Sequence, residues 1–236
     1  MSNELEGIDF REGYIAVIDK PFEWSSTDVV RKIKYALGRK GYRKIKVGHA
    51  GTLDPLATGV LLICIGKATK MVEQLQAEQK EYVADVVLGA TTPSHDLEHE
   101  IDAIYPTEHI TREGIEEVIK GLEGERLQMP PIYSAKQIGG VRAYEYARAG
   151  EQVELRQALI NIYGIEILDL QMPHLKIRVE CSKGTYIRSL AAEIGEGLES
   201  GAHLGALRRS RSGGFRVEDS WQLEDFLKKI DLLETK

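Results

Sequence analysis

The feature that most constrains the fold of this chain is the 14-residue stretch from 48 to 61, which reads GHAGTLDPLATGVL. Its three glycines permit backbone conformations and close approaches that other residues do not. Pro55 fixes its own φ and holds the preceding Asp54, the only acid of the stretch, in an extended conformation. The continuous apolar run Val60–Ile65 indicates a buried strand. The stretch therefore predicts a rigid loop that presents one carboxylate beside a core strand.

Two roles are open for Asp54. Asp-Pro pairs often begin turns and aspartate often caps helices, and from the spacing alone the turn is the favoured reading. A lone carboxylate in a stretch with basic neighbours is also a candidate covalent nucleophile. The residues of this stretch by themselves do not decide between them.

Apolar periodicity along the rest of the chain mixes strands and helices without regular alternation, which favours an α+β fold over a doubly wound sheet. Ser25 or Ser26 is placed to cap the first helix. Strands are expected at 13–19, 60–65, 80–88, 160–168, 175–181 and 204–211, and helices at 27–38, after Thr111 to about 122, at 184–198 and at 221–229.

Length and composition bound the class of protein. The 236 residues, 42% of them hydrophobic, suffice for one large domain or two small ones. We expect no membrane span, no secretory signal and a cytoplasmic location, because apolar runs are short and the start of the chain is polar. Cys64 and Cys181 lie far apart in apolar stretches, so buried reduced thiols are expected rather than a disulfide or a metal site.

The net charge of −6 at first disfavours a nucleic-acid partner. The distribution of charge matters more than the sum, however. Basic residues gather in two clusters, and their positions on either side of Asp54 in the sequence favour a track for phosphates over two merely solvated faces. The first cluster is Arg31, Lys32, Lys34, Arg39, Lys40, Arg43, Lys44 and Lys46, and the second is Lys183, Arg188, Arg208, Arg209, Arg211 and Arg216.

The stretch 128–150 combines a proline pair, a glycine pair and a short helical pattern that ends at Gly150. It reads as a loop-plus-helix excursion from the main sheet. Excursions of this length are often lids or binding loops.

The segment from His49 to Gly59, HAGTLDPLATG, closely resembles the catalytic motif of the TruB family of tRNA pseudouridine-55 synthases. The resemblance extends over about 13–217. It implies the pseudouridine synthase fold, a mixed and mostly antiparallel central sheet flanked by helices, in a single catalytic domain over 1–236. It also implies that 128–150 is a thumb-like insertion that grips RNA, and that the small C-terminal RNA-binding domain of most members is absent or replaced by one helix.

The reaction implied by this resemblance is the isomerisation of uridine at position 55, in the T loop of tRNA, with Asp54 as nucleophile. The attack on C1′, the attack on C6 and a route that begins with proton removal from C2′ all stay open. No redox step or group donor is involved, so neither a cofactor nor a metal is expected. Arg188, in the family-like segment GTYIR, is expected to keep Asp54 ionised. Without the resemblance, pairing with Glu193 or exposure to solvent would be the favoured role of Arg188.

Further site residues are implied by the same resemblance. Tyr82 would stack on the flipped base and assist proton transfer, and Tyr186 and Leu207 would line the uridine pocket. His49 would fill the position that the base vacates, and Lys136 belongs to the RNA-gripping pattern. Each has an ordinary alternative as a sheet, core or hydrogen-bonding residue.

Lys20 and Pro21 match a Lys-Pro motif of the family that braces the active-site loop. This chain departs from the pattern at Glu23, where family members commonly have glycine, and Trp24 follows it. The departure puts the shape of that loop in question.

The expected partner is tRNA through its T stem-loop. A monomer without an obligatory protein partner and without a membrane partner is expected. Two alternatives remain: a non-catalytic RNA-binding module that helps tRNA fold, and a guide-RNA-directed pseudouridine synthase within a larger particle. The insertion at 128–150 and the expected absence of the C-terminal domain argue against the guided enzyme.

Overall fold

The computed structural model describes residues 5–133, 137–138, 141–142 and 155–235. Their contacts divide the chain into two compact units, which are described separately. Unit 1 comprises 1–82 and 207–236, and unit 2 comprises 83–206. Strands β4 (Lys80–Leu88) and β12 (Ala202–Ser212) each contribute residues to both units.

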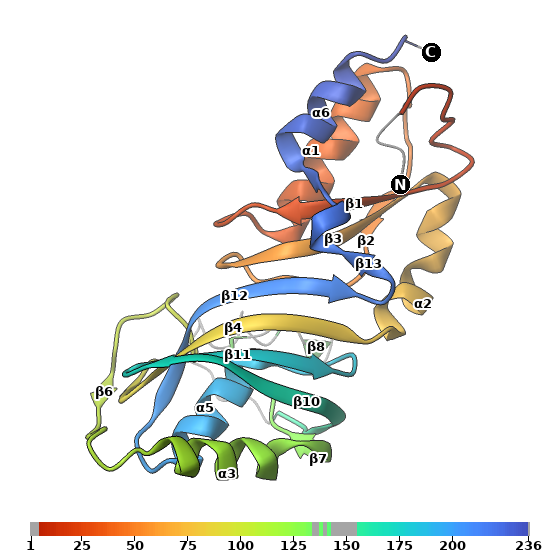
Figure 1. Ribbon diagram of the computed structural model, residues 1–236. Coiled ribbons are helices and arrows are strands. Elements are labelled where there is room, and N and C mark those ends of the chain that lie inside the picture. The colour runs from red at the N-terminus through yellow and green to blue at the C-terminus, as the bar shows by residue number, and fades with distance from the viewer. Residues whose placement is uncertain (1–4, 134–136, 139–140, 143–154, 236) are drawn as a thin grey trace. The chain divides into compact units, whose positions relative to one another are not determined.

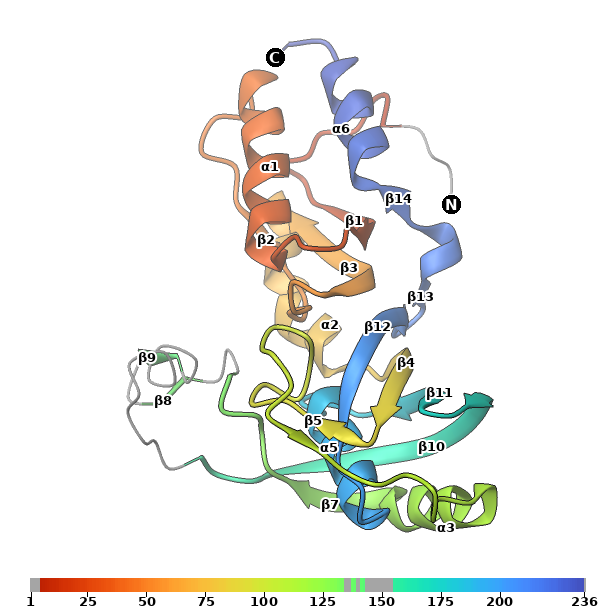
Figure 2. The ribbon, with the colours of Figure 1, turned by 90° about the vertical axis from the view of Figure 1, so that its left-hand side faces the viewer.

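Unit 1 is built around β3 (Ala57–Ile65), which pairs antiparallel with β1 (Tyr14–Lys20) and β2 (Val47–His49) and parallel with β12. The short strand β14 (Trp221–Gln222) runs parallel to β1, and β13 (Phe215–Arg216) pairs antiparallel with β12. Helices α1 (Ser26–Arg39) and α6 (Leu223–Asp231) lie side by side in both ribbon views (Figures 1 and 2). The remaining helices of this unit are α2 (Val72–Ala77) and the 3₁₀ turns Gly66–Met71 and Val217–Asp219.

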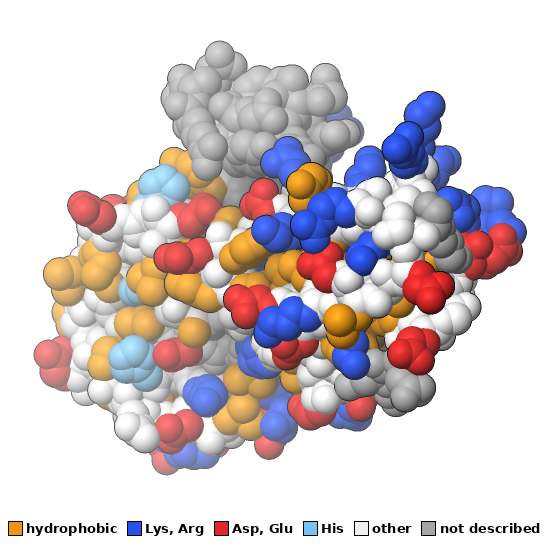
Figure 3. Space-filling model, turned by 90° about the horizontal axis from the view of Figure 1, so that it is seen from above, with side chains coloured by type: hydrophobic (Ala, Val, Ile, Leu, Met, Phe, Trp, Pro, Cys, Tyr) orange, Lys and Arg blue, Asp and Glu red, His pale blue; other side chains and the backbone are white. Residues whose placement is uncertain are grey.

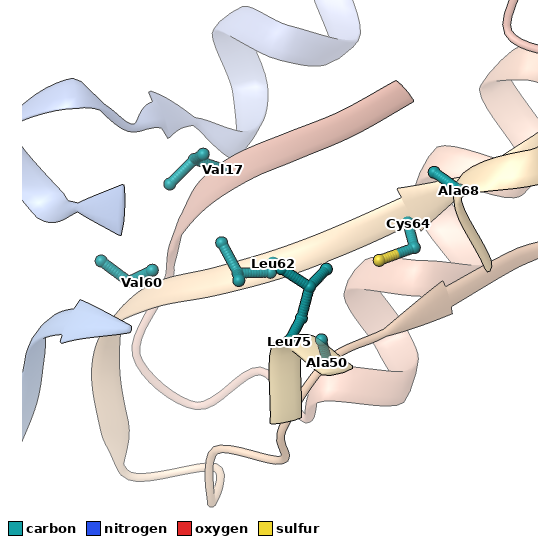
Figure 4. Close-up of a cluster of buried hydrophobic side chains, with 7 residues drawn as sticks. All are labelled: Val17, Ala50, Val60, Leu62, Cys64, Ala68 and Leu75. Carbon is teal, nitrogen blue, oxygen red and sulfur yellow. The ribbon is translucent and has the colours of Figure 1, made fainter. Parts of the chain in front are cut away.

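The core of unit 1 forms because β3 is apolar on both faces. Every residue of β3 except Thr58 is buried. Figure 4 shows Val60, Leu62 and Cys64 of this strand with the four other members of one cluster, which are Val17, Ala50, Ala68 and Leu75. Burial of one such aliphatic side chain contributes roughly 1.5–3 kcal/mol. Burial also raises the pKa of the Cys64 thiol to about 11, so the thiol stays protonated at neutral pH.

Helix α1 begins where the sequence predicts it. Ser25 is the N-cap and forms a capping box with Asp28, which satisfies main-chain donors of the first turn. Val29, Ile33 and Leu37 are buried on one face. The basic residues lie on the opposite, exposed face, as the helical periodicity requires.

Unit 2 contains the strand order β4-β11-β10-β7, in which β10 (Ala158–Gln171) pairs antiparallel with β11 (His174–Cys181) and with β7 (Gly124–Gln128). Its helices are α3 (Arg112–Leu122), capped by Thr111, and α5 (Ile187–Gly197). Two short antiparallel pairs join β5 (Ala90–Thr91) to β6 (Ala103–Ile104) and β8 (Gln137–Ile138) to β9 (Val141–Arg142).

The expected mixed, mostly antiparallel sheet with flanking helices is confirmed, and the predicted strands and helices are present within a few residues of their expected ends. Strands β2 and β7 and helix α2 were not predicted, because each is too short to show a periodic pattern. Helix α5 begins three residues later than expected, since Gly184 has φ +81° and Tyr186 is the extended N-cap.

Both cysteines are buried and free, as predicted. Most of the predicted insertion, including its helical part, lies outside the described residues. Within the described part of the chain, no helix is long and apolar enough to cross a membrane. The single-domain organisation stays a prediction.

Candidate active site

Asp54 lies in a tight turn at the start of β3. The Ala57 amide donates to the Asp54 carbonyl at 3.1 Å, which closes a four-residue turn with Pro55 in its second position. The turn reading of the sequence is therefore confirmed as geometry. Only the main chain of Asp54 closes the turn, so its half-buried carboxylate can have a separate role.

The residue before Asp54 is fixed by the first residue of α1. The Ser26 hydroxyl donates to the Leu53 carbonyl and accepts from the Leu53 amide, both at 2.9 Å. Ser26 and Leu53 are both buried. Buried hydrogen bonds of this kind are costly to break, so the start of α1 holds the backbone beside the carboxylate in one position.

Lys20 fixes the other side of the turn. Its ammonium group is fully buried and donates to the carbonyls of Pro21 at 2.8 Å, Trp24 at 2.6 Å and Pro55 at 3.1 Å. The predicted bracing role of Lys20 is thus confirmed. Burial lowers the pKa of Lys20 to about 8, while the Asp54 carboxylate acts in the opposite direction and favours the charged lysine. Lys20 is therefore a cation that interacts with Asp54 within unit 1, which the sequence interpretation missed.

Arg209 of β12 closes the same loop from the sheet side. Its guanidinium is buried and donates to the carbonyls of Val60 at 2.7 Å, Gly51 at 3.0 Å and Thr52 at 3.4 Å. Gly59 has φ +101°, and a Cβ added there would lie 2.2 Å from the Arg209 carbonyl oxygen. Only glycine fits at this crossing, which explains one of the three glycines in the motif.

The altered loop at Glu23 keeps a glycine-like backbone. Glu23 has φ +64°, and its amide donates to the Pro55 carbonyl at 2.9 Å. The departure from the family pattern therefore leaves this contact with the Asp54 turn in place. The exposed side chain is held in the left-handed region at a cost of about 1 kcal/mol.

Replacing Glu23 with glycine is expected to raise the free energy of unfolding by about 0.5 kcal/mol, because relief of left-handed strain exceeds the added entropy of the unfolded glycine. The Glu23→Ala variant keeps a Cβ and serves as the control with no gain. Urea denaturation of the three proteins measures the difference. Equal shifts in both variants would show that the side-chain charge, not the backbone, is responsible.

Activity is expected to fall as the pH rises through about 8, the pKa of Lys20. Loss of the proton removes one of three N–H donors and the positive charge near Asp54. The effect of Lys20 on stability has the opposite sign. Between pH 8 and the ordinary lysine pKa of 10.5, Lys20 binds more protons in the unfolded chain than in the folded protein. Its contribution to the free energy of unfolding therefore rises with pH in this range.

The pH dependence of kcat/KM in wild type and Lys20→Arg measures this effect. Arginine stays charged throughout the range, so the variant is expected to be slower overall but to show no decline near pH 8. Superimposable profiles would exclude Lys20 as the titrating group.

Three other predicted site residues belong to unit 1. Leu207 of β12 is half-exposed and pairs with Ala57, the last residue of the Asp54 turn. His49 ends β2 opposite Ile63 and is half-buried. Tyr82 on β4 is only 9% exposed. The register thus brings Leu207 next to the Asp54 turn.

Arg188 belongs to unit 2 and is held on several sides. Nη2 donates to the Tyr133 carbonyl at 2.9 Å, Nη1 donates to the Ser94 carbonyl at 3.3 Å, and Nε lies 3.6 Å from an Asp96 carboxylate oxygen. Arg188 is 3% exposed, so exposure to solvent is excluded. The alternative pairing with Glu193 is also wrong, because Glu193 pairs with Arg126 at 3.3 Å. Asp54 and Arg188 belong to different units, and their pairing stays a prediction.

Tyr186 is held by its main chain at the start of α5. Its amide donates to Gln128 Oε1 at 2.8 Å, and Gln128 Nε2 donates to its carbonyl at 3.2 Å. Ser189 adds a bond to the Met129 carbonyl at 2.8 Å. The half-exposed ring of Tyr186 therefore projects from a fixed backbone. Lys136, the last predicted site residue, lies outside the described residues.

The acidic partner of Arg188 comes from the polar stretch between β4 and α3. Ser94 and Asp96 are buried, and Thr92 donates to the Asp96 carbonyl at 2.6 Å. Burial lowers the pKa of His95, and the Arg188 charge lowers it further. A buried arginine requires acceptors, so a family-like arginine motif could have prompted a search for an acid among the polar loops.

The two basic clusters differ in exposure, and the expected track is wrong for four of the six members of the second cluster, since only Lys183 and Arg216 of that cluster are exposed. Arg188 and Arg209 are buried, Arg208 pairs with Asp19 at 2.8 Å, and Arg211 lies 3.9 Å from Glu81. The first cluster is exposed except at Lys40, which is half-buried. Figure 3 shows how unevenly Lys and Arg spread over one face, with many crowded at its upper right.

Within the described residues, no group of three or more His, Cys, Asp or Glu side chains could hold a metal ion. The loop chemistry around Asp54 is instead that of a single carboxylate near buried cations. A carboxylate in such a loop can act as a nucleophile or base.

Comparison with known proteins gives consistent matches. The family model for TruB family pseudouridylate synthase (N-terminal domain) matches residues 39–187, and that for the tRNA pseudouridylate synthase B C-terminal domain matches 188–236. A protein of Phocaeicola vulgatus named tRNA pseudouridine synthase B is 56% identical over 96% of this chain and 97% of its own length. A Bacteroides fragilis protein of the same name is 53% identical over 95% and 97%.

Among solved structures, a chain in a Cbf5-Nop10-Gar1 complex superimposes with a TM-score of 0.71 and 33% identity. The match covers 93% of this chain and 54% of that chain, so this chain spans about half the length of that structural relative.

Proposed function

Because this chain belongs to the TruB family of pseudouridylate synthases, we propose that it isomerises uridine to pseudouridine at position 55, in the T loop of tRNA. The observation that carries this proposal is 56% identity, across nearly the whole of both chains, to a protein named tRNA pseudouridine synthase B. The rigid turn that presents Asp54 supplies a carboxylate suited to this reaction.

The reaction breaks the bond between N1 of uracil and C1′ of ribose, turns the base and forms a bond from C5 to C1′. The proton on C5 is lost and N1 gains one, so substrate and product are isomers and no co-reactant is consumed. In our proposal Asp54 acts at C1′ or at C6, or removes the C2′ proton first. The turn offers one carboxylate for whichever of these steps occurs.

The surrounding residues serve mainly to fix that carboxylate. Ser26, Lys20 and Arg209 hold the backbone on both sides of Asp54 through buried hydrogen bonds. A nucleophile fixed in this way pays less orientation entropy on the way to the transition state. Lys20 also places a cation near Asp54, and the Asp54 carboxylate favours the protonated form of this lysine.

In our proposal the apolar and aromatic residues of the site bind the base. We assign to Tyr82 stacking on uracil, which is worth roughly 1–3 kcal/mol per base, and assistance in moving the C5 or C2′ proton. Tyr186 and Leu207 would line the uridine pocket, and His49 would fill the place of the extruded base. Extrusion itself costs a few kcal/mol, which these contacts offset.

Arg188 is proposed to supply the cation that pairs with Asp54 during the reaction. Support comes from its burial and from its contact with Asp96, which hold the guanidinium in a fixed orientation. Lys136 is proposed to contact RNA from the insertion.

The test uses the purified protein alone with an unmodified tRNA transcript. We expect one uridine per tRNA, at position 55, to be converted by the monomeric enzyme without a partner protein or guide RNA. Conversion that requires an added guide or protein would favour the guided alternative. Tight binding without any conversion would favour an RNA-folding role.

A further inference from the structure

The exposed side of α1 and the loop after it form one continuous basic surface, here called the α1 basic face. Helical spacing places Arg31, Tyr35 and Arg39 along its middle, because residues four apart fall on one side of a helix. Its members are Arg31, Lys32, Lys34, Tyr35, Arg39, Arg43, Lys44 and Lys46, all exposed. Between Asp28 and Asp54 the sequence contains no acid, and Asp28 itself lies 3.6 Å from Arg31 at the start of the face.

This face stands out against the acidic remainder of the protein. The whole chain carries a net charge of −6, and four cations of the second cluster are occupied inside their units. The face therefore holds the densest exposed positive charge of the described surface clusters. Clustered exposed cations on an otherwise acidic protein are the electrostatic footprint of a polyanion site.

Tyr35 adds a second recognition element. Its side chain is 68% exposed, and the Arg39 guanidinium lies 5.8 Å from its ring centre. Arg39 in turn pairs with Asp231 of α6, which fixes it over the ring. Tyrosine hydroxyls and arginine forks both donate to phosphate oxygens.

The start of α1 fixes the distance of this face from the proposed reaction. Ser26, its first residue, is bonded to Leu53 beside Asp54. The helix has 14 residues and thus a length of about 21 Å at 1.5 Å per residue. Arg39 and the loop after it lie at the far end.

We propose that the α1 basic face binds the phosphate backbone of a paired stem of the substrate RNA, up to about 20 Å from the reacting uridine. The proposal rests on the proposed function for the identity of the substrate. Its specific content is that this face recognises helical RNA outside the reacting loop. It thereby distinguishes a complete tRNA from an isolated loop.

The test removes four exposed cations of the face and leaves Arg31 and Arg39, which pair with Asp28 and Asp231. The face variant is K32Q/K34Q/R43Q/K46Q, in which glutamine keeps a similar helix propensity. The control variant is K70Q/K120Q/K176Q/K229Q, which removes the same charge from exposed positions elsewhere. Two substrates are compared: a full-length unmodified tRNA, and a hairpin with the reacting loop and only three base pairs. Unchanged Tm values verify the folds.

We expect the face variant to raise KM and Kd for full-length tRNA roughly tenfold and to leave kcat unchanged, because phosphate contacts position the RNA and do not take part in the reaction. For the face variant, the slope of log Kd against log salt concentration should be smaller by about two or more, since each lost phosphate contact reduces this slope by about one. With the hairpin, and for the control variant with either substrate, changes should stay within about twofold.

Equal losses on tRNA and hairpin, or an equal loss in the control variant, would overturn the proposal, since the effect would then be local to the loop or a matter of net charge. No change on tRNA would overturn it as well. The direct Kd measurement separates failure of the proposed function from failure of the proposed stem binding by the α1 basic face. If wild type forms no pseudouridine but the face variant alone weakens tRNA binding, the proposed function fails and this inference stands.

Discussion

Replacing Asp54 with asparagine is expected to reduce the rate of pseudouridine formation by at least about a thousandfold while tRNA binding stays within a few-fold of wild type. The amide has nearly the same shape as the carboxylate but is neither nucleophilic nor basic. The turn should survive, because the bond that closes it uses the main-chain carbonyl of Asp54 and not its side chain. The loss should therefore be confined to the reaction itself.

Two companion variants sharpen this prediction. Asp54→Glu keeps the carboxylate but displaces it by about one bond length, and such misplacement typically costs around a hundredfold. Glu73→Gln removes another, exposed acid from unit 1 and should act like wild type. Release of tritium from C5-labelled uridine in tRNA measures all three rates. Substantial turnover by Asp54→Asn would exclude Asp54 as the nucleophile.

Replacing Arg188 has the second largest expected effect, and its two variants should differ in kind. Arg188→Ala leaves Asp96, 7% exposed at its side chain, as a buried carboxylate without this partner. Loss of one member of a buried pair typically costs about 3–5 kcal/mol of stability. Arg188→Lys keeps the charge but cannot reproduce the fork that reaches the carbonyls of Ser94 and Tyr133.

For Arg188→Lys we expect a smaller loss of Tm than for Arg188→Ala, normal tRNA binding and a kcat lowered roughly a hundredfold, because in our proposal the guanidinium pairs with the reacting carboxylate. The exposed Arg178, which pairs with Glu166, is the matched control, since surface pairs contribute little. Thermal unfolding and single-turnover kinetics separate the two effects. Full activity in a stable Arg188→Lys protein would show that Arg188 has only a structural role.

Much of the local architecture could be predicted from the sequence because it is encoded locally. The capping serine and the apolar stripe of α1 determine that helix. The uninterrupted apolar run of β3 and the strict alternation of β4 determine those strands. Such patterns reflect the periods of helix and strand and do not depend on distant contacts.

The roles of the cations could not be predicted, because they depend on pairing between distant segments. Arg208 and Arg209 look alike in the sequence, yet the parallel register of β12 with β3 buries Arg209 and directs its guanidinium to the Asp54 loop, while Arg208 pairs with Asp19. Strand alternation gives neighbouring residues opposite faces, but the buried face is decided by tertiary structure. The sequence interpretation therefore counted structural arginines as part of an RNA track.

The residues around the proposed nucleophile show the same division. Asp54, Leu207 and Lys20 were recognised through a motif, and their placement around one turn is consistent with it. Asp96 was missed because a polar stretch gives no sign that its side chains are buried. Glu23 departs from the motif, but its backbone has a positive φ of 64°, a conformation that glycine adopts readily.

The most direct test of the account is nucleoside mapping of one tRNA transcript after incubation with the purified protein. We predict that position 55 becomes pseudouridine, without a change in mass, in the wild-type reaction and stays uridine with Asp54→Asn. Uridine at position 55 after prolonged incubation with the folded, tRNA-bound wild type, or pseudouridine formed there by Asp54→Asn, would contradict it.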